Sequence, residues 1–436
     1  MFKDICRIGG AVALGLIPSI AFAQAIPAPA LPGRIEQEIQ RPPEPRPAPD
    51  VVPIPAERFP EQVPPGAQDV VFTLRRVDLV GNRALSTETL SAEWADRIGQ
   101  QIRLSDVFAI ASALTARYRR EGYILSQVIV PKQEIRTGEG VVRLQVLEGH
   151  IANVTFNAPG LDVRALQPYA APIVAERPLS LGTLERSLLL LNELPGVTAR
   201  ANLRPSAVPE ASDLEVNVAQ QRRVFSVGLH NRGGHALGPQ RLDALADFRG
   251  VLSDFDRHHL RLLSSLNNRL NLLAYGGEMP VGASGLRALW ALSHSRAVPR
   301  TGLPARIDTD STSLSIGASY PIIRSRELGL AARAALTAYD GESDLAGLPI
   351  TRDKLRALRI GLTWDAVDDL LGLNLVDVEY AHGLSGLGAS SRTDPEVMAA
   401  GTNPQFRKTT IYAARLQSLG GAWSVLLAAT AQHSSD

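Results

Sequence analysis

By residue type, the stretches best suited to chemistry are an adjacent histidine pair, His258 and His259, and a short acidic run, "DAVDD", from Asp365 to Asp369. A metal site needs several imidazole or carboxylate groups that converge on one point. Successive side chains of a strand point to opposite faces, so the two imidazole rings cannot easily share a metal ion. The acidic run lies at a predicted strand junction, where a charged turn is the better interpretation. Neither stretch predicts a metal site.

The chain also lacks the short motifs that mark common active sites. It contains no G-x-S-x-G nucleophile turn, no H-E-x-x-H zinc motif and no glycine-lysine phosphate loop. The glycines of "GLSGLG", residues 383–388, are spaced loosely like a phosphate-binding loop, but no predicted helix follows them. We therefore predict no enzyme activity, no catalytic residue and no cofactor. A formal net charge of +1 gives no indication of a nucleic-acid partner.

The N-terminal region is typical of an exported protein. In residues 1–23, Lys3 and Arg7 precede an apolar run that ends in "AFA", which predicts a secretory signal peptide. The single cysteine, Cys6, lies inside this signal, so the mature chain would contain no disulfide bond. Residues 24–69 are rich in proline and predict an extended linker. Within it, "GRIEQEIQ", residues 33–40, fits either two helical turns or plain linker.

Two small modules follow the linker. Residues 70–150 predict a strand, two helices and two further strands, and the second helix carries one apolar face. Gly122 occupies a helix C-cap position, and "YILSQVIV", residues 123–130, predicts the strand after it. Residues 151–220 repeat the same order of elements. Two copies in tandem indicate a pair of α+β modules.

Residues 221–436 change character and predict about eleven strands without an amphipathic helix. In "STSLSIGASY", residues 311–320, serine and glycine alternate with leucine, isoleucine and tyrosine. Strands of about ten residues that alternate in this way, in an exported chain, are typical of a transmembrane antiparallel β-barrel with a polar interior. A soluble β-sandwich is the alternative.

Three stretches together resemble the two-partner secretion outer-membrane transporters of the hemolysin-activator and filamentous-hemagglutinin type. They are "GYILSQVIVPKQEIRTGEGVVRLQVLEG" at 122–149, "LERSLLLLNELPGVTARANLRP" at 184–205 and "LHNRGGHALGPQRL" at 229–242. The resemblance covers residues 70 to 436. It implies that residues 70–150 and 151–220 are POTRA modules in the periplasm and that residues 221–436 form a barrel in the bacterial outer membrane. It also makes a barrel-plugging helix at 33–40 an equal alternative to plain linker.

The sequence departs from this family in two places. The stretch "RPSAVPEASDL" lacks the glycines that the family usually carries before the last strand of the second module. Family barrels have sixteen strands and a Val-Arg-Gly-aromatic loop motif, whereas this chain predicts about eleven strands and lacks the motif. Because eleven strands leave open edges that lipid cannot satisfy, we expect a C-terminal truncation.

The resemblance implies export of one large partner exoprotein from the periplasm to the cell surface, in contact with outer-membrane lipid. An outer-membrane barrel assembly factor is the alternative. We predict that the exoprotein binds between the second helix of the first module and the strand 123–130. An exposed edge of that strand would pair with an extended segment of the exoprotein. The predicted partner-binding residues are Tyr118, Tyr123, Leu125, Gln127, Val128 and Val130.

Overall fold

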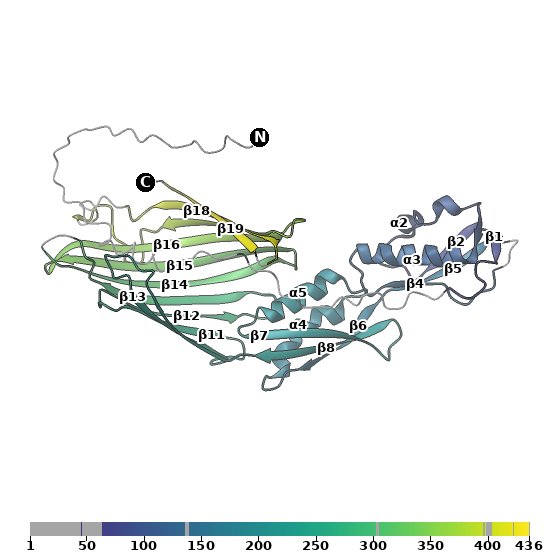
Figure 1. Cartoon of the computed structure of the whole chain (residues 1–436), viewed down its shortest axis with the longest axis horizontal. Helices are drawn as coiled ribbons and strands as arrows, with labels where there is room; N and C mark the ends of the chain where they lie inside the picture. Colours follow the sequence, from purple (N-terminus) through teal and green to yellow (C-terminus); the bar gives the residue numbers. More distant parts are fainter. Residues whose placement is uncertain are drawn as a thin grey trace.

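The computed structural model describes residue 45 and residues 63–135, 139–301, 305–395, 397, 403–421 and 423–435. The predicted signal peptide, residues 1–23, and the segment 33–40 lie outside these residues, as does most of the predicted linker. Figure 1 shows three parts in chain order, namely two small modules and a large curved sheet that lies beyond the second module. Among the described residues, no helix is both long enough and apolar enough to cross a membrane.

The first module packs helix α3 (Leu104–Arg120) on a three-stranded sheet whose strand order is β2-β5-β4. These strands are β2 (Arg76–Val80), β4 (Gln127–Ile129) and β5 (Val141–Leu147), and a separate pair joins β1 (Val71–Thr73) to β3 (Gln101–Arg103). The helices α2 (Thr87–Ser91) and η2 (Ala95–Arg97) complete the module. The predicted apolar face of α3 forms its core, with Val107, Ile110, Ala111, Leu114 and Tyr118 all buried.

The predicted strand over residues 123–130 is wrong in its first half. Only Gln127–Ile129 is a strand, because the chain first turns away from α3. Gly122 has a φ of 90°, as its predicted C-cap position requires, and the N–H of Ser126 donates to the carbonyl oxygen of Tyr123 at 3.1 Å. A turned segment cannot pair with β5 until residue 127.

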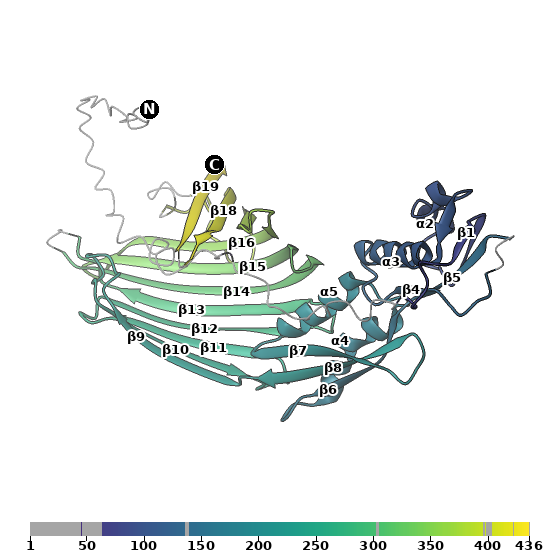
Figure 2. The same ribbon diagram turned by 45° about the vertical axis from the view of Figure 1, so that its right-hand side comes forward.

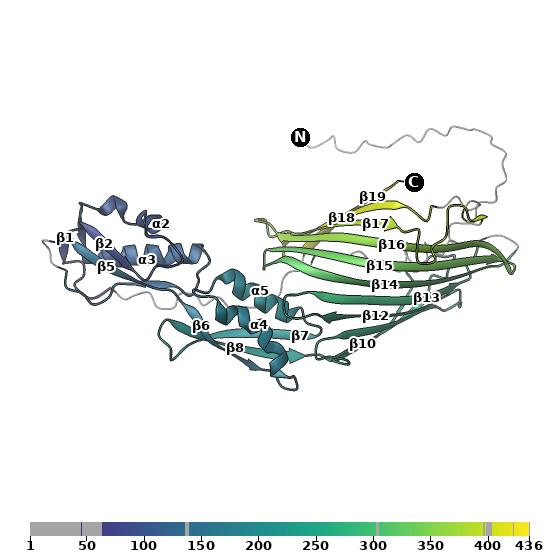
Figure 3. The same cartoon turned by 180° about the vertical axis from the view of Figure 1, so that it is seen from behind.

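The second module has the same sheet arrangement, with strand order β6-β8-β7. Its strands are β6 (His150–Asn157), β7 (Val197–Pro205) and β8 (Ala211–Gln220). Two helices, α4 (Val163–Ala175) and α5 (Leu181–Asn192), lie together on one face of this sheet (Figure 3). The leucines of α5 supply much of the core, since Leu184, Leu188 and Leu191 are all buried.

The two modules are joined by hydrogen bonds and apolar packing as well as by the chain. The N–H of Leu181 donates to the carbonyl oxygen of Gly122 at 2.8 Å, and the N–H of Leu179 donates to that of Gly149 at 3.0 Å. Leu125 packs against the core of the second module. A Cβ atom at Gly149 would lie 2.3 Å from the carbonyl oxygen of Leu125. Glycine is therefore needed at 149 for the turn that carries Leu125 into the joint to lie this close to the end of the first module.

The large sheet contains eleven antiparallel strands within the described residues, each hydrogen-bonded to its neighbours in the chain. It is not closed there, because β9 and β19 lie at its two edges. Figure 2 shows its curvature. The fold class of α+β modules followed by a large antiparallel sheet is thus confirmed. The strands are β9 (Arg223–His230), β10 (Arg241–Arg249), β11 (Arg257–Ser265), β12 (Leu270–Pro280), β13 (Arg287–Ala297), β14 (Ile307–Arg324), β15 (Leu328–Leu345), β16 (Leu348–Val367), β17 (Leu373–Gly383), β18 (Arg407–Gly420) and β19 (Trp423–Ser435).

A pair of glycine substitutions tests the joint between the modules. In a fragment of residues 63–220, Gly149→Ala should lower the free energy of unfolding by about 1–3 kcal/mol, because the added methyl group overpacks the joint. Gly182→Ala should instead raise it by about 0.5–1 kcal/mol, because residue 182 lies in α5 with open space around its Cα. Urea unfolding followed by circular dichroism measures both. Equal effects of the two substitutions would contradict a tight joint at Gly149.

Candidate functional site

The large sheet has two faces of opposite character. On β14, Ser311, Ser313 and Ser315 lie on one face, while Leu314 and Ile316 lie on the other and are 42% and 59% exposed. The strand register continues both faces across the sheet, so that Ile316 has Trp290 and Leu336 as neighbours on its two sides. A continuous exposed apolar surface of this kind marks a contact with a membrane or with another protein. We call the two surfaces the polar face and the apolar face.

Ion pairs between strands lie across the polar face. Asp377 on β17 accepts from Arg333 at 2.5 Å and from the hydroxyl of Thr363 at 2.6 Å. Glu379 accepts from Arg359 at 2.8 Å. A second group, on β10 and β11, pairs Arg257 with Asp247 at 2.9 Å and Arg261 with Asp243 at 2.7 Å. Positive and negative charges therefore alternate over the polar face rather than forming a field of one sign.

The apolar face is limited in height. On β14 it runs from Leu314 to Ile322, and eight steps at about 3.3 Å each give a band of about 26 Å. Beyond this band the same face of the long strands becomes charged. Its cross-strand ion pairs there are Arg296 with Asp308 at 3.6 Å, Arg352 with Glu342 at 3.1 Å and Arg356 with Asp340 at 2.6 Å. Nine residues bounded by polar ends is the length that a tilted strand of an outer-membrane barrel needs to cross the membrane.

The two stretches first considered for metal binding have other roles. His258 lies on the apolar face, where its Nδ1 is 2.8 Å from the hydroxyl of Tyr275, whereas His259 pairs in register with Asp247 on the polar face. Asp368 binds Arg415, Asn374 at 3.0 Å and the N–H of Gly372 at 3.0 Å, as a charged turn requires. Over the part of the chain that the structure describes, three or more potential metal ligands do not cluster anywhere.

The six residues predicted to bind a partner do not form one exposed groove. Tyr118 and Val128 are 0% and 2% exposed and belong to the core of the first module. Leu125 packs into the joint with the second module. Tyr123, Gln127 and Val130 are half-buried and remain accessible from the surface beside β4. The structure therefore leaves these last three partly accessible, without joining all six at one surface.

The edge of β4 is also less available than its sequence suggests. The N–H of Val128 points away from β5 and donates to Oγ1 of Thr115 at 2.9 Å. This side chain of α3 thus occupies the donor that an added strand would need. Thr115 is absent from the predicted residues, because a threonine within a helix gives no local indication that it bonds a neighbouring strand. One donor of this edge is thus already occupied, and strand addition at this position stays a prediction.

Glu148 organises the first module and is likewise absent from the predicted residues. Its Oε1 atom accepts from the N–H groups of Arg83 at 2.7 Å and Ala84 at 2.8 Å. The hydroxyl of Tyr118 donates to the same oxygen at 3.1 Å. One carboxylate therefore ties the connection before α2 to α3 and to the end of β5. Burial, followed by the negative charge of Glu148, raises the pKa of Tyr118 above its ordinary value.

This shift predicts a loss of stability in alkaline solution. Because the pKa of folded Tyr118 lies above the unfolded value of about 10, its stabilising effect is complete below that pH and is lost as the pH rises further. Tyr118→Phe should flatten the decline in unfolding free energy of residues 63–220 above about pH 10. Tyr123→Phe is the control and should leave the decline in place. Urea unfolding measured over this pH range gives the unfolding free energy of each variant. An unchanged decline in Tyr118→Phe would contradict the raised pKa of Tyr118.

Comparison with known proteins gives matches for each part of the chain. Residues 72–149 match the family model described as POTRA domain, ShlB-type. The heme/hemopexin transporter protein HuxB of Haemophilus influenzae is 27% identical over 210 residues, which are 47% of this chain and 36% of that protein. The outer membrane transporter CdiB of Dickeya dadantii is 24% identical over 368 residues, which are 79% of this chain and 62% of that protein. The chain therefore spans about a third of the length of HuxB and less than two thirds of that of CdiB.

Two solved structures share the fold. CdiB from Escherichia coli has a TM-score of 0.70 at 20% identity, covering 89% of this chain and 72% of that one. CdiB from Acinetobacter baumannii has a TM-score of 0.57 at 14% identity, covering 93% and 75%. These matches confirm the resemblance to two-partner secretion transporters that the sequence motifs indicate. Residues 72–149 thus form a POTRA domain of the ShlB type in a chain with the fold of CdiB.

Proposed function

We propose that this protein is an outer-membrane transporter that exports a large partner protein from the periplasm to the cell surface. One observation carries the proposal, namely a two-faced antiparallel sheet that directly follows a ShlB-type POTRA domain and its neighbouring module. The apolar face provides a surface for lipid, and the polar face provides a lining for a hydrated path.

The two ends of the strands support one orientation in the membrane. The second module contacts the turns between strands at one end, as when the hydroxyl of Tyr169 donates to the carbonyl oxygen of Gly282 at 3.3 Å. The charged extension of β14 to β16 lies at the opposite end, around Asp308 and Glu342. The modules would then lie in the periplasm, and the charged strand ends would project from the cell surface.

The polar face suits passage of an unfolded chain. Its arginine and carboxylate groups are paired with one another, so a passing segment of either charge meets no large field that would hold it. No nucleotide is available in the periplasm, and folding of the exported protein outside the cell would give the passage its direction. The identity of the cargo is not encoded in these residues. A barrel assembly function has less support, because the matched relatives are named as transporters.

The first contact with the cargo is proposed for the surface beside β4. Tyr123, Gln127 and Val130 would touch the partner, while Tyr118 and Val128 support them from the core and Leu125 holds the joint. A photocrosslinking amino acid at Gln127 should capture the N-terminal region of a large exported protein encoded beside this gene. The same group at Arg164, an exposed position on α4, should not. Crosslinking at Arg164 alone would place the contact on the second module instead.

Opposite faces of β14 give a matched test of membrane insertion. Ala318→Arg would place a charge at the middle of the apolar band and should cost about 2–4 kcal/mol of folding free energy in lipid. Ser315→Arg would place the same charge on the polar face and should be tolerated. The readout is the fraction of protein that fractionates with outer membranes and runs as a heat-modifiable band. Equal yields of the two variants, or release of the unaltered protein by salt alone, would contradict a membrane-spanning sheet.

A further inference from the structure

The second module is attached to the large sheet by a very short covalent connection. Strand β8 ends at Gln220 and β9 begins at Arg223, so only two residues lie between them. Hydrogen bonds support this connection, since the N–H of Gln221 donates to Gly196 and the carbonyl oxygen of Gln221 accepts from Arg249 at 2.8 Å. A single point of attachment of this kind leaves the angle between two bodies free to vary.

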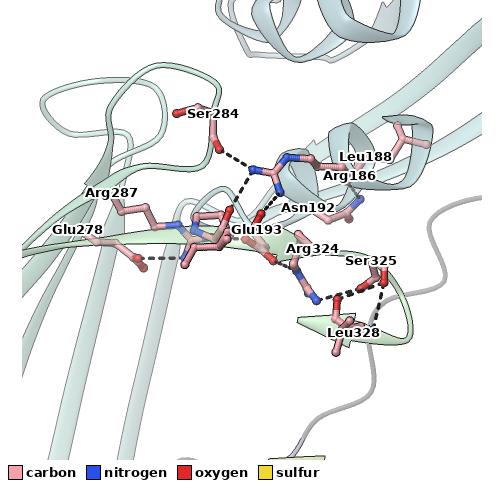
Figure 4. A network of polar contacts seen from close by, with 12 residues as sticks. Arg186, Leu188, Asn192, Glu193, Glu278, Ser284, Arg287, Arg324, Ser325 and Leu328 are labelled. Carbon is pink, nitrogen blue, oxygen red and sulfur yellow. Dashed lines mark hydrogen bonds and ion pairs between the residues drawn. The ribbon is translucent and has the colours of Figure 1, made fainter. Parts of the chain in front are cut away.

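A second attachment lies several strands away, at the ends of β13 and β14. Glu193, which caps the C-terminus of α5, accepts from Arg287 of β13 at 2.6 Å and also from Arg324 of β14. Figure 4 shows the carboxylate between the two arginines. All three side chains are only 17–26% exposed, so water screens these ion pairs less than it screens surface pairs.

Arg186 of α5 binds an irregularity in β14. The pairing of β14 with β15 shifts register between Pro321 and Ile323, which marks a β-bulge. The guanidinium of Arg186 donates to the carbonyl oxygens of Pro321 at 3.0 Å and Ile322 at 3.4 Å. It also donates to Ser284 at 3.4 Å (Figure 4). The bulge thus presents carbonyl groups at the rim, and the helix supplies a planar set of donors that fits them.

Steric fit accompanies these polar contacts. Gly285 has a φ of 94°, and a Cβ atom there would lie 2.7 Å from Cδ2 of Leu190 and 2.5 Å from Cγ of Pro321. Gly282, in the same turn, also has a positive φ but has nothing within 4 Å of such a Cβ atom. A cavity of about 340 Å³ lies beside the contact and is lined by Glu193 together with residues of the sheet. Its shape therefore depends on where α5 sits.

We propose that Arg186 and Glu193 are positioning residues that fix the angle of the second module on the sheet. We call their contacts with Arg287, Arg324 and the bulge the docking contact. The short connection at β9, the packing of Phe255 into the core of the module, the hydrogen bond of Tyr169 to Gly282 and the docking contact at β13 and β14 hold the module at separated points, which limits its freedom to pivot. The role of the docking contact in export rests on the proposed function. There, the docking contact would keep the POTRA modules aligned with the entrance to the polar face.

Distances between spin labels in the full chain test this assignment. Labels are attached to Arg200→Cys on β7 and Leu370→Cys in the turn after β16, both exposed, in a Cys6→Ser background in lipid. Pulsed electron resonance should give one narrow distance distribution. Arg186→Ala and Glu193→Ala should each broaden it at least twofold, while Arg164→Ala should not. The melting temperature of the second module should stay unchanged, because neither residue lies in its core.

The two glycines supply a charge-free control within one turn. Gly285→Ala should broaden the distribution by displacing Leu190, whereas Gly282→Ala also places alanine at a positive φ and should leave it narrow. Distributions that stay narrow in Arg186→Ala, Glu193→Ala and Gly285→Ala would overturn the proposal. This outcome is independent of export, since the distances are measured without cargo. A broadened distribution with normal export would overturn only the role in alignment.

Discussion

Every backbone group of a strand that faces lipid must find its partner on a neighbouring strand, and the architecture of the large sheet follows from this constraint. Each strand from β10 to β18 pairs on both sides with its neighbours in the chain, so short turns suffice and no crossover is needed. Given this pairing, the period of two along each strand separates the polar face from the apolar face. The cross-strand ion pairs, such as Arg333 with Asp377, follow from the register of the ladder rather than setting it.

The small modules depend on a different kind of constraint, which is the close approach of backbone to backbone. Glu148 draws a loop, a helix and a strand end onto one carboxylate oxygen. Gly149, the next residue, allows Leu125 to come within reach of the second module. Two adjacent residues therefore order one module and attach it to the next. In the proposed orientation, Glu148 and Gly149 therefore help to hold both periplasmic modules in place.

The sequence predicts the features that depend on local periodicity. The apolar face of α3, the serine face of β14 and the positive φ of Gly122 all depend on neighbouring residues, and the structure confirms them. The length of β4 is mispredicted because the turn before it is held by residues of another module. Local sequence patterns also do not predict the roles of Arg186 and Glu193, since the partners of these residues lie about a hundred residues further along the chain. On a helix surface, such charges resemble ordinary solvated side chains.

The strands differ in length, and this gives the sheet an uneven rim. Strands β10 and β11 have 9 residues each, whereas β14 and β15 have 18 and β16 has 20. At about 3.3 Å per residue, β16 is longer than β11 by about 36 Å. The excess lies at the end away from the modules, where Arg352 and Glu342 pair on what would otherwise be the apolar face. In the proposed orientation, these three strands form a hydrated wall that projects beyond the apolar band on the cell surface.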